Sequence, residues 1–256
     1  MKTAGLVEEV RKFIAASGGT VGFVPTMGAL HEGHASLIEQ AVIENDLVVV
    51  SVYVNPTQFN NSEDLKNYPL AADEDLVLLE SLGVDLVFTP TYDVIYPDNF
   101  RYKVVENEFS NELCGGHRAG HFDGVLTVVL KLLNIIQPDK AYFGEKDYQQ
   151  FLLVQQMAAA LFLDVQIVPV PTVRESDGLA MSSRNRNLDC ESRRKAPLMY
   201  ELLNSDFADD QVASQLADAG FDVDYVVTKF NRRFAAASLG LADKKVRLID
   251  NVKRNQ

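Results

Sequence analysis

Hydrophobic residues along the chain form short continuous runs that alternate with stretches of helical periodicity. The run from Leu47 to Val54 is almost entirely apolar, which is typical of a parallel strand that is covered on both faces. Between His34 and Asn45 the apolar residues instead recur at spacings of three and four, which predicts an amphipathic helix. The same two patterns predict further strands at residues 20–24, 84–88, 140–143 and 165–170, and further helices at residues 65–82, 125–136 and 151–161. This alternation indicates βαβ units and therefore an α/β fold built on a doubly wound parallel sheet.

The pattern changes after Pro171, where a second region of the chain is expected to begin. Residues Arg174–Gly178 are polar and turn-like, and the sequence that follows is charged and has shorter apolar segments. We therefore place a domain boundary within residues 171–185. The expected organisation is a sheet domain over residues 1–172, followed by a small C-terminal α+β domain over residues 173–256.

Composition and charge narrow the classes of protein to consider. Hydrophobic residues make up 47% of the 256 residues, which is enough for a sizeable core. Acidic residues outnumber Lys and Arg by 36 to 24, and the resulting net charge of -12 argues against a large nucleic-acid surface. A locally positive pocket for a small anion remains compatible with this charge.

Neither a disulfide scaffold nor a membrane segment is predicted. Cys114 and Cys190 lie far apart and form no CxxC pair, which fits a reducing compartment. Residues 1–13 contain acids where a signal peptide needs an apolar run, and the apolar run Leu47–Val54 is too short to span a bilayer. We therefore expect a cytoplasmic protein with no membrane partner and no nucleic-acid partner.

The first candidate site follows the predicted strand at residues 20–24. His31 and His34 stand three apart at the expected start of a helix, where side chains share a face and exposed backbone N–H groups attract anions. Two imidazoles there can donate hydrogen bonds to phosphate oxygens, and Gly28 and Gly33 allow the backbone to approach a ligand closely. A metal site and a pair of surface histidines are the alternatives, although the spacing differs from that of HExxH zinc helices.

Two later segments also contain groups that suit phosphate. Lys146 lies in Phe143–Gln150, directly after a predicted strand, where its ammonium can neutralise a transferred phosphoryl group. Its neighbour Asp147 could hold a ribose or a magnesium ion. In Met181–Asn185, two serine hydroxyls and the planar guanidinium of Arg184 can clamp a triphosphate. A solvated charged turn and an ordinary serine-rich linker are the respective alternatives.

Two polar loops complete the set of candidate segments. Gln58, after a predicted strand, can fix a hydroxyl or a carboxylate, although Asn55–Phe59 could equally be a β-turn. Cys114–Gly124 is glycine-rich and places Arg118 and His121 where they could face an anion. Zinc is disfavoured in this loop because the sequence offers no second pair of ligands.

Taken in order, these segments resemble the pantothenate synthetase (pantoate–β-alanine ligase) family. The resemblance covers most of the chain and rests on PTMGALHEGH at 25–34, VNPTQF at 54–59, GHFDGV at 120–125, FGEKDYQQ at 143–150, MSSRN at 181–185 and RLIDN at 247–251. Within the nucleotidylyltransferase superfamily to which that family belongs, HEGH is similar to the HIGH signature and MSSRN to the KMSKS loop. Each motif is modest alone, whereas the ordered set is specific.

The resemblance implies an ATP-dependent ligase of pantothenate biosynthesis, with a Rossmann-like N-terminal domain that binds ATP and pantoate and a small C-terminal lid. The carboxylate of (R)-pantoate would attack the α-phosphate of ATP, forming pantoyl adenylate and pyrophosphate. The amine of β-alanine would then attack the acyl carbon and release AMP and pantothenate. Mg²⁺ and a homodimer are implied as well. A closed lid would keep water from the mixed anhydride.

The resemblance also implies roles for individual residues. Catalysis is implied for His31, His34, Lys146, Ser182, Ser183 and Arg184. ATP binding is implied for Met27, His34, Gly144, Lys146, Asp147, Val173, Met181, Ser182, Ser183 and Arg184, with the backbone of Val173 meeting the adenine. Pantoate binding is implied for Pro25, Met27, Asn55, Gln58 and Gln150, and less directly for Arg118 and His121, on a loop near the dimer contact. No side chain is assigned as a magnesium ligand.

Two features depart from the family pattern. Ala119 stands where many relatives have proline, which predicts a more mobile loop. The chain is also short after about residue 200, where relatives usually carry a longer C-terminal domain. Three rival functions stay open. The first is nucleotidyl transfer to a phosphate by another enzyme of the superfamily, and the second is tRNA aminoacylation, which the charge disfavours. The third is ATP binding without catalysis.

Overall fold

The computed structural model describes residues 1–60, 65–66, 68–69, 71–241 and 244–254 and divides into two compact units. Unit 1 comprises Met1–Glu145 and Gln149–Val170, and unit 2 comprises Lys146–Tyr148 and Pro171–Gln256. The short segment Lys146–Tyr148 thus groups with unit 2, although its neighbours along the chain on both sides belong to unit 1. The functional roles that the sequence assigns to the two domains stay predictions.

Unit 1 contains a six-stranded sheet with the order β1-β4-β3-β2-β5-β6, in which every pair is parallel. Its strands are β1 (Lys2–Ala4), β2 (Val21–Thr26), β3 (Leu47–Val52), β4 (Leu86–Phe88), β5 (Lys140–Gly144) and β6 (Gln166–Val170). Because β2 pairs with β3 on one side and with β5 on the other, the chain order reverses between β2 and β5. Such a switch point places ligand sites at the carboxyl ends of the strands that flank it.

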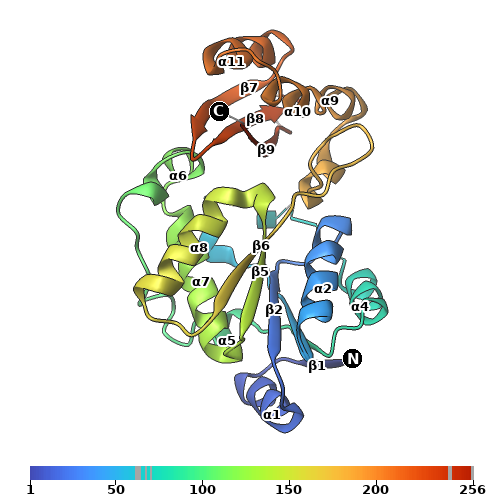
Figure 1. Cartoon of the computed structure of the whole chain (residues 1–256), viewed down its shortest axis with the longest axis vertical. Helices are drawn as coiled ribbons and strands as arrows, with labels where there is room; N and C mark the ends of the chain where they lie inside the picture. Colours follow the sequence, from blue (N-terminus) through green and yellow to red (C-terminus); the bar gives the residue numbers. More distant parts are fainter. Residues whose placement is uncertain (61–64, 67, 70, 242–243, 255–256) are drawn as a thin grey trace. The chain divides into compact units, whose positions relative to one another are not determined.

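Helices cover both faces of this sheet. They are α1 (Val7–Ser17), α2 (Glu32–Glu44), α4 (Ala72–Ser81), α5 (Tyr92–Ile95), α6 (Cys114–His117), α7 (His121–Ile136) and α8 (Tyr148–Ala160), with single 3₁₀ turns η1 (Pro56–Gln58), η2 (Phe109–Asn111) and η3 (Glu145–Asp147). Figure 1 shows α2 and α4 to the right of the strands and α7 and α8 to the left. On β3, Val50 packs in one cluster with Ile38 and Leu79, whereas the adjacent Val49 faces the opposite side, and both valines are fully buried. Burial on both faces explains the continuous apolar run of this strand.

The predicted α/β fold is confirmed, and several elements begin or end at other residues than expected. Helix α7 begins at His121 rather than Val125. Its N-cap is Gly120, which adopts a φ of +74°, and its first residues precede the apolar run from which the helix was predicted. The helical pattern at residues 65–82 becomes α4 only from Ala72, and residues 67 and 70 within it lie outside the described part of the chain. Strand β1 and helix α1 were not predicted.

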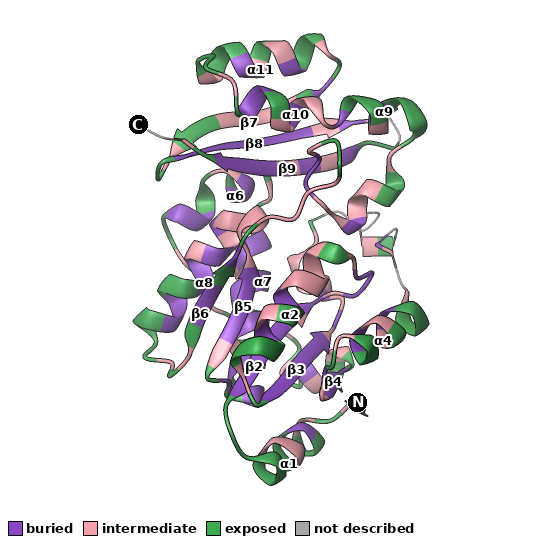
Figure 2. Cartoon of the chain, turned by 45° about the vertical axis from the view of Figure 1, so that its right-hand side comes forward, coloured by how far each residue is buried: buried purple, intermediate pink, exposed green. Residues whose placement is uncertain are grey.

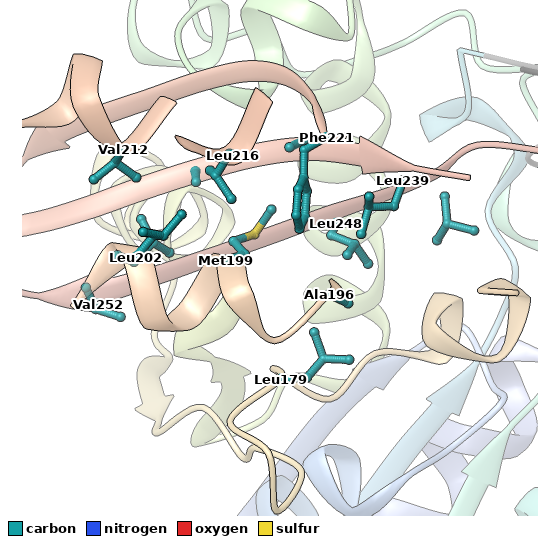
Figure 3. Packing of buried hydrophobic residues seen from close by; sticks show 14 residues of the cluster. Leu179, Ala196, Met199, Leu202, Val212, Leu216, Phe221, Leu239, Leu248 and Val252 are labelled. Atoms are coloured by element: carbon teal, nitrogen blue, oxygen red, sulfur yellow. The ribbon is translucent and has the colours of Figure 1, made fainter. Parts of the chain in front are cut away.

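Unit 2 is a small α+β body, as the sequence predicts. An antiparallel sheet of β7 (Asp222–Lys229), β8 (Arg232–Leu239) and β9 (Val246–Lys253) is joined by α9 (Cys190–Lys195), α10 (Leu198–Leu203), α11 (Asp209–Asp218) and the 3₁₀ helix η4 (Ser183–Asn187). Figure 3 shows its core, where Met199 of α10, Leu216 of α11 and Leu248 of β9 meet around Phe221. Leu179 belongs to the same cluster and fixes the chain just before MSSRN.

Burial follows the strands in both units. Figure 2 shows the central strands β2 and β3 of unit 1, and β8 and β9 of unit 2, as mostly buried elements. Among the helices of the described residues, none combines the length and the apolar character that a membrane crossing requires.

Candidate functional site

The HEGH segment forms the start of α2 and orients both of its histidines through the backbone. Nδ1 of His31, the N-cap residue, accepts a hydrogen bond from the N–H of Gly33 at 3.1 Å, and Nδ1 of His34 accepts one from the N–H of His31 at 3.3 Å. Because a backbone N–H only donates, both Nδ1 atoms are acceptors, and the neutral rings carry their proton on Nε2. The ring centroids lie 4.1 Å apart. The helix start therefore holds two neighbouring imidazoles whose Nε2–H groups are donors.

Asn55 lies three residues after the end of β3, and every hydrogen-bonding group of its side-chain amide bonds to the protein. Its Nδ2 donates to Oε1 of Gln58 at 3.0 Å and to the carbonyl of Gly124 at 3.2 Å. Its Oδ1 accepts from the hydroxyls of Thr57 at 3.0 Å and Tyr96 at 2.9 Å. Burial raises the pKa of the Tyr96 hydroxyl to about 12, so this group is a donor at neutral pH. The four hydrogen-bonding positions of Asn55 are thereby occupied by protein groups, and one of these groups is the side chain of Gln58.

Gln58 is held through its backbone as well as its side chain. Its Nε2 lies 3.2 Å from Sδ of Met27, and its carbonyl oxygen contacts Nδ1 of His121 at 2.8 Å and Nη2 of Arg118 at 3.3 Å. Nη1 of Arg118 lies 3.0 Å from Nε2 of His121. Because the carbonyl only accepts and the guanidinium only donates, this geometry requires the Nδ1–H tautomer of His121. The structure thus places Arg118 and His121 on the backbone of Gln58.

The other predicted residues of unit 1 lie at strand ends or at the start of α8. Pro25 belongs to β2, Gly144 is the last residue of β5, and Gln150 lies in the first turn of α8. Parallel strands end at the same edge of a sheet, so the segments after β2, β3 and β5 leave from one edge. Hydrogen bonds join the predicted residues into two groups, one of His31 and His34 and one of Met27, Asn55, Gln58, Arg118 and His121.

In unit 2, strand β9 holds the segment that carries Lys146. Nζ of Lys146 lies 3.6 Å from Oδ2 of Asp147, and the side chain of Lys146 is 19% exposed. The carbonyl of Lys146 accepts from Nδ2 of Asn251 at 3.0 Å, and Oδ1 of Asn251 accepts from Nη1 of Arg232 at 2.6 Å. The guanidinium of Arg232 lies 4.0 Å from the ring centroid of Tyr148. Asn251 of the RLIDN motif therefore supports Lys146 within unit 2.

The turn that precedes MSSRN is tied to the same strand. Arg174 forms a bidentate ion pair with Asp250, with Nη to Oδ distances of 2.6 and 2.9 Å, and its guanidinium lies 3.8 Å from the ring centroid of Tyr200. Nη1 of Arg174 also donates to the carbonyl of Gly178 at 3.1 Å. Gly178 has a φ of +90°, and a Cβ there would lie 2.6 Å from Tyr200, so this turn requires glycine.

The MSSRN segment begins beside the residue predicted to meet adenine. The carbonyl of Val173 accepts from the N–H of Met181 at 3.0 Å. Ser182 is the N-cap of η4, and its Oγ accepts from the N–H of Arg184 at 3.3 Å. Ser183 is buried in the first position of η4. The predicted nucleotide residues of unit 2 therefore form two segments, Lys146–Asp147 and Val173–Arg184, and both are anchored to β9.

The sequence did not indicate the residues that hold the predicted ones in place. Asp75, Tyr96 and Arg232 are buried polar residues without a local motif, and their partners lie far along the chain. Tyr96 is 41 residues from Asn55, for example. Asp250 and Asn251 differ in this respect, because they belong to the matched RLIDN motif.

Comparisons with known proteins agree along nearly the whole chain. The sequence profile described as Pantoate-beta-alanine ligase matches residues 2–253. A pantothenate synthetase from Bdellovibrio bacteriovorus is 57% identical over 235 residues, which is 92% of this chain and 92% of that protein. A pantothenate synthetase from Coxiella burnetii is 46% identical over 233 residues, 91% of this chain and 89% of that protein.

Solved structures agree with the fold as well. The pantoate–β-alanine ligase of Francisella tularensis, complexed with β-γ ATP and β-alanine, matches with a TM-score of 0.93 and 42% identity over 99% of this chain and 97% of that one. The pantothenate synthetase of Thermus thermophilus matches with a TM-score of 0.89 and 40% identity over 99% of both chains. Against these two structures the C-terminal part is not shortened, in contrast with the expectation from the family pattern. The resemblance is confirmed, and the chain belongs to the pantoate–β-alanine ligase family.

Proposed function

We propose that this enzyme joins (R)-pantoate to β-alanine at the expense of ATP, through a pantoyl-adenylate intermediate. The observation that carries the proposal is the orientation of His31 and His34 at the start of α2. Their Nδ1 atoms accept backbone N–H groups, so each neutral ring carries its proton on Nε2, beside a helix N-terminus that favours anions. These are the groups needed where negative charge develops on transferred phosphate.

In the first step, a carboxylate oxygen of pantoate attacks the α-phosphorus of ATP, and the bond to pyrophosphate breaks. The amide of Gln58, held by Asn55, is proposed to bind the hydroxyl or carboxylate of pantoate together with Gln150. Pro25 and Met27 would line this pocket. The negative charge on the phosphates is proposed to be neutralised by His31, His34, Lys146, Ser182, Ser183 and Arg184, with Gly144, Asp147, Val173 and Met181 lining the nucleotide site. No nucleophilic side chain is required, because the substrate supplies the nucleophile.

In the second step, the amine of β-alanine attacks the acyl carbon of pantoyl adenylate. The new C–N bond forms, the bond between the acyl carbon and the phosphate oxygen breaks with its electron pair on AMP, and the amine loses a proton. The protein is proposed to hold the mixed anhydride away from water during this interval.

Mg²⁺ is proposed to accompany the ATP phosphates. In the part of the chain that the structure describes, no group of three His, Cys, Asp or Glu side chains is arranged to hold a metal ion. Mg²⁺ in nucleotide sites usually relies on substrate phosphates and only one or two carboxylates, and Asp147 beside Lys146 fits that pattern. Bound there, the ion would neutralise phosphate charge.

We also propose a cytoplasmic homodimer, as the family resemblance implies. Both cysteines are free thiols, which is compatible with a reducing compartment. Analytical ultracentrifugation at micromolar concentration tests the assembly, and a single species of 28.4 kDa would contradict the dimer.

The adenylate intermediate is tested by isotope exchange. With ATP, Mg²⁺ and pantoate but without β-alanine, the enzyme is expected to exchange labelled pyrophosphate into ATP, and omission of pantoate is expected to abolish the exchange. Net turnover without pantoate-dependent exchange would instead favour direct condensation. ATP binding without any pyrophosphate release would support the rival non-catalytic function.

A further inference from the structure

The turn that delivers the two histidines has an unusual backbone. Gly28 and Ala29 both adopt left-handed conformations, with φ of +81° and +51°. The second of these is strained, because a side chain with a Cβ rarely adopts a positive φ. Ala29 and Leu30 are buried, and α2 begins only two residues later at Glu32. Something outside the turn must therefore stabilise it.

That stabilising group is the carboxylate of Asp75 on α4. Its Oδ2 accepts from the N–H of Ala29 at 2.8 Å, and its Oδ1 accepts from the N–H of Leu30 at 2.7 Å. Successive backbone N–H groups around a left-handed residue form a concavity that binds anions, and here the anion is a side chain of the protein. Asp75 is 3% exposed.

The position of Asp75 leaves the turn little freedom. A Cβ on Gly28 would lie 3.0 Å from Oδ2 of Asp75, so the carboxylate packs directly against the glycine. Helix α4 is in turn fixed by Leu79, which is fully buried in the same cluster as Leu30. The turn is therefore clamped between a rigid helix and the sheet.

We propose that Asp75 is a positioning residue, which holds the turn at Gly28–Leu30 so that His31 and His34 meet the phosphates of ATP in the correct place. This inference rests on the proposed role of the two histidines. A carboxylate suits the task because both of its oxygens only accept, whereas an amide would present its NH₂ group to one of the two N–H donors.

The test is a double-mutant cycle between Asp75→Asn and His34→Ala, with pyrophosphate release as the readout. Asp75→Asn is expected to lower kcat at least about tenfold while the KM for β-alanine changes less than about twofold. In the His34→Ala background the same substitution is expected to cost less than in the wild type, because one of the two positioned histidines is already gone. Asp73→Asn, an exposed acid on the same helix, is the matched control and is expected to leave kcat unchanged.

The outcomes separate the inference from the proposed function. If His34→Ala lowers kcat but Asp75→Asn has no effect, or has the same effect in both backgrounds, the positioning role is wrong and the histidine role stands. If His34→Ala itself leaves kcat unchanged, the proposed function of the histidine is wrong. Should Asp75→Asn not fold, the cycle is run with Asp75→Asn/Ala29→Gly, because glycine adopts the φ of Ala29 without strain.

Discussion

Polar side chains bond backbone groups at both ends of the parallel sheet, but the parts of the chain that they hold in place differ. At the amino end, carboxylates cap backbone N–H groups of the strands and their approaches: Asp46 accepts from Thr20, Asp85 from Val48 and Asp139 from Val21. At the carboxyl end, the protein uses hydrogen bonds to orient side chains such as His34 and Gln58. We propose that the amino end stabilises the fold, while the carboxyl end positions groups for a ligand. Paired substitutions at the two ends test this division.

Strand β5 offers the clearest pair, because Lys140 begins it and Lys146 follows it. Lys146→Ala is expected to lower kcat/KM at least about 100-fold, a loss of about 3 kcal/mol of transition-state stabilisation, with little change in unfolding temperature. Lys140→Ala removes a surface ion pair with Glu44 and is expected to cost about 0.5 kcal/mol of stability with activity unchanged. Steady-state pyrophosphate release and thermal unfolding measure the two. Equal losses of activity would contradict the division between the two ends.

A pair of glutamines tests substrate binding at the same two ends. Gln58→Ala is expected to raise the KM for pantoate about 10- to 100-fold, because it removes hydrogen bonds to a charged ligand, while the KM for ATP changes little. Gln166→Ala alters an exposed residue at the amino end of β6 and is expected to leave both constants unchanged. An equal rise in the KM for both substrates of Gln58→Ala would argue against a pantoate site at this glutamine.

The amino end is expected to show the reverse pattern. Asp139→Ala removes the acceptor that lies 2.6 Å from the N–H of Val21, and it is expected to cost about 1 kcal/mol of unfolding free energy. For a chain of this size, that corresponds to a fall in Tm of about 2–4 °C. Calorimetry and kcat are measured together, and a loss of kcat at unchanged Tm would contradict a purely structural role.

The smallest effect expected is a pH dependence at Glu44. Hydrogen bonding to Lys140 lowers the pKa of Glu44 to about 2. A carboxyl group with a depressed pKa stabilises the fold fully above its unfolded pKa and loses this contribution as pH falls through the folded pKa. The difference in unfolding free energy between the wild type and Glu44→Gln is therefore expected to be about 0.5 kcal/mol at pH 7 and 5 and to shrink between about pH 4.5 and 2. Urea unfolding across this range measures it, and a difference that is as large at pH 2 as at pH 7 would point to a cause other than titration.

The spacing of apolar residues predicted those strands and helices in which the apolar positions are the buried ones. Leu47–Val52 is recognisable as a strand because both of its faces are buried, and the order of the motifs was enough to indicate the family. Asp75 was not predictable, because it stands among the exposed acids of α4, and only its contact with Ala29 and Leu30 distinguishes it from Asp73. Where such contacts join distant residues, the local pattern carries no trace of them.

The grouping of Lys146–Tyr148 with unit 2 determines how this enzyme can be dissected or recombined. A fragment that ends after β6 keeps Lys146 but loses Asn251, which holds its carbonyl, and Arg232, which stacks on Tyr148. Exchange of C-terminal halves between relatives at residue 170 would replace the support of the lysine without replacing the lysine. Unit 2 is therefore encoded by two separate stretches of the gene. Substitutions in β9 are expected to require matching changes in Lys146–Tyr148, about a hundred positions upstream.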